Sequence, residues 1–220
     1  MICQRLDVVL HRDRHTGPDG RYKIRSIYFD DYWNTAYEEK LMGISDRKKY
    51  RIRFYNDQDD VIHLECKRKS GSGSYIHKSS APLTREETEK ILTGDYGFLL
   101  KHENPLCQQF YVQCICRILR PRIIVDYERE PFVMVTGDVR ITFDKDVRAA
   151  AFMGDGFDPK LPALHVLEPG KLIMEVKFTE LLPDIVKRIL PPRSSELAAV
   201  SKYVLCCERT DFLTAETTIL

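Results

Sequence analysis

Polar and apolar residues alternate along several segments of this chain in the way that predicts β-strands. In KYRIRFY at 49–55, Tyr50, Ile52 and Phe54 share one face, and Arg51 and Arg53 share the other. The same spacing of two recurs in three further segments, with Lys67 and Lys69 in HLECKRK, Tyr127 and Arg129 in VDYERE, and Glu175 and Lys177 in IMEVKF. The repeated pattern predicts a closed or strongly curved antiparallel sheet with a basic interior and helices over its apolar outer face. Four separately solvated strand faces are the alternative.

The rest of the pattern predicts an α+β fold. Strands are expected at 22–29, 49–56, 61–69, 122–129, 139–144 and 171–178, and a return strand is expected from Tyr75 to Lys78. Helices are expected near 2–10, 31–41, 85–93 and 105–119 and after Pro183, with a last helix capped by Ser194 or Ser195 and running to about Glu208. The 85–93 helix has a capping box, formed by Thr84 and Glu87. Hairpin-linked strands interrupted by helices favour α+β over an alternating parallel sheet.

Composition limits the possible functions. The 220 residues fit one domain, 1–220, and the net charge is only +1, from 34 Lys+Arg against 33 Asp+Glu. A general polyanion binder is therefore not indicated, any basic site must be local, and no nucleic-acid partner is expected. The seven Cys form no pair of CxxC motifs, and we see neither a membrane-spanning stretch nor a signal-peptide core. These features lead us to expect reduced thiols and a cytoplasmic location.

The charged strand faces supply the candidate site residues. Arg51 and Arg53 would lie about 7 Å apart along one face, which suits neighbouring phosphates of one chain. Lys67 and Lys69 repeat this arrangement on the next strand, and Lys78 follows on the return strand. Two further pairs share a face: Tyr127 with Arg129, and Arg140 with Asp144, although an exposed edge explains the second equally well. Together these residues predict an anion site.

A carboxylate and a helical pair complete the candidates. Glu175 lies among cations, where it is either an ion-pair partner or a hard-oxygen ligand for Mg²⁺ or Mn²⁺ that bridges to phosphate oxygens. Ser201 and Lys202 lie on the predicted last helix. From the residues alone, we interpret this pair as part of an ordinary exposed helical face.

Nine segments, taken together and in order, resemble a known family. They are RSIYFDD at 25–31, KYRIRFY at 49–55, HLECKRK at 63–69, HKSSAPLT at 77–84, PRIIVDYEREPF at 121–132, VRITFDKDVR at 139–148, IMEVKF at 173–178, LPDIVKRIL at 182–190 and SKY at 201–203. The chain resembles the VTC domain, the polyphosphate polymerase domain of the triphosphate tunnel metalloenzyme, or CYTH-like, superfamily. The resemblance implies an eight-stranded antiparallel tunnel that holds triphosphate or polyphosphate along basic walls, with one divalent metal.

The resemblance also implies residue roles. The family's phosphate-contacting positions match the six cations Arg51, Arg53, Lys67, Lys78, Arg129 and Arg140, with Tyr127 as a hydroxyl donor. Its metal-binding glutamate matches Glu175, and its Ser-Lys pair matches Ser201 and Lys202, of which the lysine resembles the residue nearest the transferred phosphate. The implied reaction transfers the γ-phosphate of ATP to a growing inorganic polyphosphate chain, with Mn²⁺ or Mg²⁺ as cofactor.

Other functions remain open within the resemblance. A triphosphatase would use the same tunnel with water as acceptor. A non-catalytic module that binds polyphosphate or inositol pyrophosphates would need the basic walls but not Glu175 or Lys202. A membrane partner that carries the product away is compatible with all three.

The N-terminus departs from the family pattern. VTC-like domains begin with a strand of alternating acidic and basic residues that closes the tunnel, and this sequence starts after the expected position of that strand. We expect either an eight-stranded tunnel or that tunnel without its first strand. In the second case, restoring an upstream strand is expected to raise both thermal stability and activity.

Overall fold

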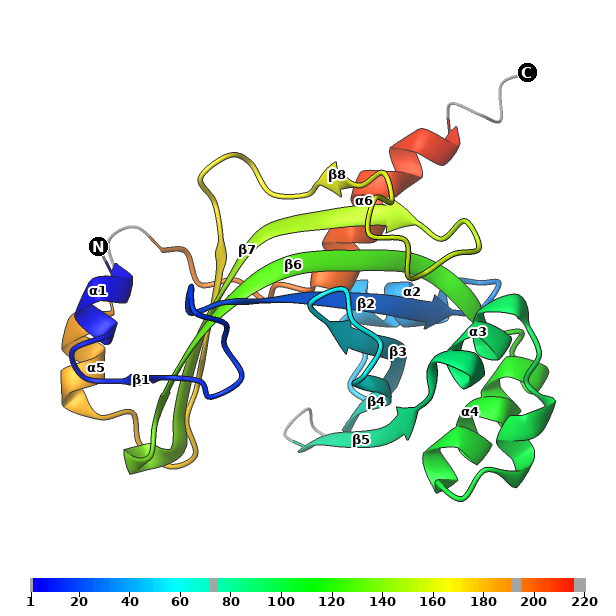
Figure 1. The fold of residues 1–220 in the computed structure, drawn as a ribbon, viewed down its shortest axis with the longest axis horizontal. Coiled ribbons are helices and arrows are strands. Elements are labelled where there is room, and N and C mark those ends of the chain that lie inside the picture. The colour runs from blue at the N-terminus through cyan, green and yellow to red at the C-terminus, as the bar shows by residue number, and fades with distance from the viewer. Residues whose placement is uncertain (1, 72–74, 191–194, 216–220) are drawn as a thin grey trace.

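The computed structural model describes residues 2–71, 75–190 and 195–215, which form a large curved antiparallel sheet with helices beside it (Figure 1). The predicted α+β class is confirmed. The described strands are β1 (His11–Arg12), β2 (Tyr22–Asp30), β3 (Arg47–Tyr55), β4 (Ile62–Ser70), β5 (Tyr75–Leu83), β6 (Arg120–Met134), β7 (Val139–Ala151), β8 (Leu164–His165) and β9 (Ile173–Lys177). Their order is β5-β4-β3-β2-β6-β7-β8, with β1 paired to β6 and β9 paired to β7.

The helices in the described ranges lie around this sheet. They are α1 (Ile2–Leu6), α2 (Thr35–Leu41), α3 (Arg85–Thr93), the 3₁₀ turn η1 (Gly97–Lys101), α4 (Pro105–Cys116), the 3₁₀ turn η2 (Thr136–Asp138), α5 (Asp184–Ile189) and α6 (Lys202–Ala215). In Figure 1, α3 and α4 lie at one end of the sheet, and α1 and α5 lie at the other. No helix in the described part of the chain is both long enough and apolar enough to cross a membrane.

The sheet differs from the expected closed eight-stranded tunnel. Its nine described strands form an open sheet, in which β5 is at one end and β8 and β9 pair with different stretches of β7 at the other, while β1 pairs with β6. Two of the nine, β1 and β8, are only two residues long and were not predicted. The curvature brings residues of β4, β5 and β9 to one cavity even though these edges are not neighbours in the sheet.

The apolar strand faces pack as the alternation predicts. Ile52 and Leu64 are fully buried beneath α4. Phe110 of α4 packs edge-on against Phe29, with the two ring centroids 5.0 Å apart. Burial of such side chains contributes about 1.5–3 kcal/mol each. With its apolar side covered, the sheet leaves its polar side facing the cavity.

Helix ends show one confirmed feature and two corrections. The α3 capping box is present, since Thr84 Oγ1 accepts from the Glu87 amide and Glu87 Oε2 accepts from the Thr84 amide. The expected last-helix caps are wrong where they can be examined: Ser195 lies in an irregular segment, Ser194 lies outside the described residues, and α6 begins at Lys202. The helix expected at 105–119 ends at Cys116, because Ile118 adopts a left-handed φ of 55°.

Candidate functional site

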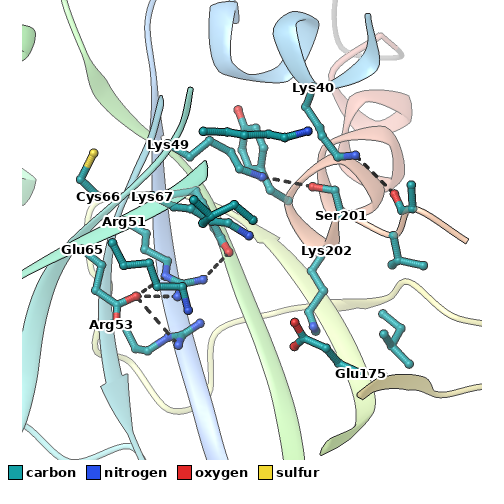
Figure 2. A pocket seen from close by; sticks show the side chains of 18 of the residues that line it. Lys40, Lys49, Arg51, Arg53, Glu65, Cys66, Lys67, Glu175, Ser201 and Lys202 are labelled. Carbon is teal, nitrogen blue, oxygen red and sulfur yellow. Dashed lines mark hydrogen bonds and ion pairs between the residues drawn. The ribbon is translucent and has the colours of Figure 1, made fainter. Parts of the chain in front are cut away.

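The concave side of the sheet encloses a cavity of about 610 Å³ whose walls are strongly basic (Figure 2). Two carboxylates, Glu65 and Glu175, line it. The cationic side chains lining it in the described part of the chain number eleven: Lys40, Arg47, Lys49, Arg51, Arg53, Lys67, Lys69, Lys78, Arg129, Lys177 and Lys202. Such an excess of fixed positive charge in a walled cavity attracts a highly charged anion.

Arg51 and Arg53 lie on β3, in the middle of the basic wall, and neighbouring side chains hold their guanidinium groups. Arg51 Nε donates to Glu65 Oε2 at 2.7 Å, and Arg51 Nη1 donates to the Tyr28 hydroxyl at 2.9 Å. Arg53 donates to Ser26 Oγ and to the Tyr127 hydroxyl, each at 3.2 Å. These contacts orient both arginines before any ligand arrives, which reduces the entropy lost when a phosphate binds.

Tyr28 belongs to this cluster and was not predicted as a site residue. Its burial favours the neutral phenol, but Arg51, Lys49 and Arg53 outweigh that effect and lower the pKa of Tyr28 to about 8. Its ring also packs on that of Tyr203 in α6, with centroids 5.1 Å apart. In the sequence, Tyr28 is marked only by sharing a strand face with Ser26. That position does not distinguish a tyrosine of a binding site from a tyrosine of the core.

Asp144 links the sheet to the start of α6. Its fully buried carboxylate accepts from Arg129 Nε at 2.7 Å and Nη2 at 2.8 Å, and its Oδ2 lies 2.5 Å from Lys202 Nζ. Burial favours the protonated acid, but Arg129 and Lys202 hold the pKa of Asp144 below its usual value. The sequence placed Asp144 on the face of Arg140 without assigning it a role; here it positions two cavity cations.

Lys202 of α6 and Glu175 of β9 both line the cavity, and in the view of Figure 2 they lie across it from Arg51. The Lys202 ammonium pairs with Asp144 rather than with Glu175, but it is close enough to influence the pKa of Glu175. Lys202 Nζ also lies 4.8 Å from the centre of the Tyr127 ring, and Glu175 Oε1 lies 3.0 Å from Lys177 Nζ. Burial alone would raise the pKa of Glu175, but Lys177, Arg129 and Lys202 lower it, so the carboxylate is ionised at neutral pH.

Charged residues of β9 influence the pKa values of lysines on β4 and β5 across the cavity. Burial lowers the pKa of Lys67, and Glu175 and Lys177 of β9 are the next largest influences. Burial also lowers the pKa of Lys78, and Lys177 lowers it further. Glu175 attracts Lys67, whereas Lys177 repels both Lys67 and Lys78, and an anion between β4, β5 and β9 would offset this repulsion among the lysines.

Ser201 and three unpredicted cations, Lys40, Arg47 and Lys49, lie toward α2 and the segment before α6. Ser201 Oγ accepts from Lys49 Nζ at 3.2 Å, and Ser201 O accepts from the Leu205 amide, as at a helix N-terminus. Lys40 reaches the Ala199 carbonyl at 3.4 Å. Lys49 could have been predicted, because it continues the Arg51 and Arg53 alternation by one step.

Arg140 is the predicted phosphate contact that the structure does not bring into the cavity. It is absent from the cavity lining, its Nη2 lies 2.8 Å from Asp13 Oδ2, and it donates to the Tyr22 hydroxyl at 3.4 Å. It is the second residue of β7 and lies opposite the cavity residue Lys177, so its contacts with Asp13 and Tyr22, rather than its place in the sheet, keep its side chain out of the cavity. The other nine predicted site residues all line the cavity: Arg51, Arg53, Lys67, Lys78, Tyr127, Arg129, Glu175, Ser201 and Lys202.

A metal would find few protein ligands here. Across the described residues, no group of three or more His, Cys, Asp or Glu side chains could hold an ion. Glu175 is the one carboxylate on the wall that also carries Lys202, so a divalent cation at this wall would take its other ligands from phosphate oxygens and water. Mg²⁺ and Mn²⁺ accept such a shell readily.

Comparison with known proteins identifies the family. The family model described as VTC domain matches residues 1–210. The chain belongs to the VTC domain family. It is therefore a member of the triphosphate tunnel superfamily, as the resemblance implied.

Among solved structures, the VTC chain is similar to the crystal structure of a Bacillus halodurans protein provisionally named an adenylate cyclase. The two share 12% identity with a TM-score of 0.50, over 89% of this chain and 85% of that chain. At this identity the likeness shows the fold alone. No curated protein matches the chain.

Proposed function

We propose that this VTC domain is a polyphosphate polymerase that transfers the γ-phosphate of ATP to the end of an inorganic polyphosphate chain. The observation that carries the proposal is one cavity in which eleven cations of the described residues surround two carboxylates, and to whose lining Lys202 at the start of α6 and Glu175 of β9 both contribute. ATP and inorganic polyphosphate or triphosphate are the proposed ligands.

The cavity residues divide the work of the proposed transfer. Arg51, Arg53, Lys67 and Lys78 bind the acceptor chain along the β3–β5 wall, while Arg129 and Lys202 offset the charge on the oxygens of the transferred phosphoryl group. The bond between the γ-phosphorus and the β,γ-bridging oxygen breaks, with its electrons leaving on ADP. A terminal phosphate oxygen of the acceptor forms the new bond to phosphorus. Since that oxygen is already anionic, the transfer needs no general base.

The residues at Glu175 fit a divalent cation. An ionised carboxylate beside a site for phosphate gives Mg²⁺ or Mn²⁺ one fixed oxygen ligand, and the ligand phosphates supply more. When bound, the cation would neutralise phosphate charge and orient the nucleotide.

Product analysis tests the proposal. The purified chain is incubated with ATP and Mn²⁺, and the products are resolved by gel for polyphosphate and assayed for free phosphate. We expect chains of increasing length from wild type, and at least a hundredfold less from Lys202→Ala and from Glu175→Ala. Lys171→Ala is the control, since Lys171 is exposed and pairs with Glu168 outside the cavity. Free phosphate without chains would indicate the triphosphatase, and ligand binding without turnover would indicate the binding module.

A further inference from the structure

Two of the segments that carry the family resemblance contain residues to which the proposed function gives no role. They are Asp30 in RSIYFDD and Tyr203 in SKY. The structure joins them, since the Tyr203 hydroxyl donates to Asp30 Oδ2 although the two residues lie 173 positions apart in the sequence. Asp30 is 3% exposed and Tyr203 is 1% exposed, so water does not compete for this hydrogen bond. Because hydrogen bonds are directional, the contact fixes how α6 is oriented against the end of β2.

Asp30 also anchors α2. Its Oδ1 accepts from the Ala36 amide at 2.9 Å and its Oδ2 accepts from the Tyr37 amide at 3.1 Å, both in the first turn of the helix. A carboxylate is a favourable acceptor there, because the first amides of a helix lack the usual helical partners. The same helix carries Lys40 to the cavity, where it reaches the Ala199 carbonyl just before α6. One carboxylate therefore ties the start of α2 to the start of α6.

Three consecutive residues at the start of α6 are held by three different strands. Ser201 contacts β3 through Lys49, Lys202 contacts β7, and Tyr203 contacts β2. All three residues line the cavity. Successive helical residues point about 100° apart around the helix axis, so the three contacts together fix the rotation of the helix. When Lys202 turns toward a bound anion, the other two contacts must hold the helix in place.

The hydroxyl of Tyr203 suits that task better than its ring does. The ring packs on Tyr28 with centroids 5.1 Å apart, and apolar packing is not directional. The hydrogen bond to Asp30 weakens steeply when its angle changes, and backbone amides hold its acceptor in place. Precision matters for Lys202, because a misplacement of about 1 Å at a reacting centre can cost about a hundredfold in rate.

We propose that Tyr203 is a positioning residue, whose hydrogen bond to Asp30 sets the rotation of α6 and so directs Lys202 to phosphate in the cavity. The inference rests on the proposed function in one respect, namely that Lys202 contacts a phosphate of the ligand. It gives the two unassigned motif residues one shared role.

A double-mutant cycle tests the proposal. Calorimetry measures the affinity for inorganic tripolyphosphate of wild type, Tyr203→Phe, Lys202→Ala and the double variant, and thermal melting measures their stability. Tyr203→Phe keeps the ring that packs on Tyr28 and removes only the hydroxyl. Tyr96→Phe is the matched control, since Tyr96 is also buried but lies just before η1, outside the cavity. No measurement requires turnover, so a failed polymerase assay leaves this test intact.

We expect Tyr203→Phe to lower the affinity about fivefold when Lys202 is present, and by less than about twofold when residue 202 is already alanine. A contact that only stabilised the fold would lower the melting temperature and leave the affinity unchanged. Tyr96→Phe should bind with wild-type affinity. The proposal is overturned if Tyr203→Phe binds tripolyphosphate like wild type, if it weakens binding equally in both backgrounds, if Tyr96→Phe weakens binding as much, or if Lys202→Ala does not weaken binding.

Discussion

Asp144 offers the sharpest stability prediction, because one fully buried carboxylate holds two cations. Its partners are themselves largely covered, with 12% of the Arg129 side chain and 17% of the Lys202 side chain exposed. Asp144→Ala would leave both charges close together in the interior without a counterion. Removing one partner of a buried ion pair costs about 3–5 kcal/mol, and we expect a loss of the free energy of unfolding in this range.

Urea unfolding followed by circular dichroism at neutral pH measures this loss. Asp46→Ala is the control, because Asp46 is exposed and lies 3.5 Å from the exposed Arg68; it should change stability by less than about 1 kcal/mol. Adding Lys202→Met to Asp144→Ala should recover part of the loss, since one uncompensated cation is then removed. Tripolyphosphate should raise the melting temperature of Asp144→Ala more than that of wild type, because its phosphates replace the missing carboxylate.

The dependence of stability on acid pH tests the same contribution of Asp144. The pKa of Asp144 is lower in the folded protein than its ordinary value, so its stabilising contribution is complete above that ordinary value and is lost as the pH falls through the folded-state pKa. The stability difference between wild type and Asp144→Ala should therefore persist at mildly acidic pH and shrink only under strongly acidic conditions. A loss below about 1 kcal/mol at neutral pH, or no recovery on adding Lys202→Met, would refute the reasoning.

Three further predictions concern the cavity. Absorbance of tyrosinate should reveal one tyrosine ionising near the pKa of about 8 assigned to Tyr28, and Tyr28→Phe should abolish that step. Because this folded-state pKa is below the unfolded one, wild type should gain stability relative to Tyr28→Phe as the pH rises through 8 toward 10; an unchanged difference would count against the arginine contacts. Arg140→Met should leave tripolyphosphate affinity, measured by calorimetry, within about twofold of wild type, whereas Arg53→Met should lower it at least tenfold; equal losses would return Arg140 to the site. Raising salt from low to physiological concentration should weaken tripolyphosphate binding by wild type more than by Arg53→Met, and a salt-independent affinity would contradict an electrostatic site.

Local alternation was enough to predict much of the basic wall. Arg51, Arg53, Lys67 and Glu175 were identified because a strand places every second side chain on one face, and the structure gathers all four at one cavity. Spacing and chemistry also suggested that the arginines bind phosphate and that Glu175 either pairs with a cation or binds a metal, whereas the roles of Ser201 and Lys202 came only from the family resemblance. Alternation could not show that Asp144 holds Lys202, because that contact joins β7 to α6 across 58 residues of sequence.

The end of β6 was harder to predict, because Pro131 suggests that the strand stops whereas pairing with distant strands extends it. Strand 122–129 was expected to end before Pro131, yet β6 continues to Met134. The carbonyl of Pro131 accepts from the Asp13 amide, and a strand residue's N–H points to the same side as its carbonyl. The N–H that Pro131 lacks would therefore point toward the β1 side of β6. There β1 pairs with β6 only at Phe132 and Val133, and β2 has not yet begun, so proline removes no hydrogen bond between paired strands.

The start of α6 depended on long-range contacts too. Ser194 and Ser195 are good caps by residue type, but the chain from Ser195 to Val200 runs irregularly, and its last three residues line the cavity. The helix begins where Lys202 can reach Asp144 and Tyr203 can pack on Tyr28. Neither partner is visible from the local sequence.

The central claim is that this basic cavity transfers phosphoryl groups between phosphates. The most direct measurement supplies ATP labelled on its γ-phosphorus, with Mn²⁺ and a short polyphosphate primer, and follows the label on a gel beside the Glu175→Ala, Lys202→Ala double variant. The claim predicts label in chains longer than the primer for wild type alone, with one ADP formed for each phosphate added. Label found only in free phosphate, or in equal amounts of lengthened chains from both proteins, would contradict it.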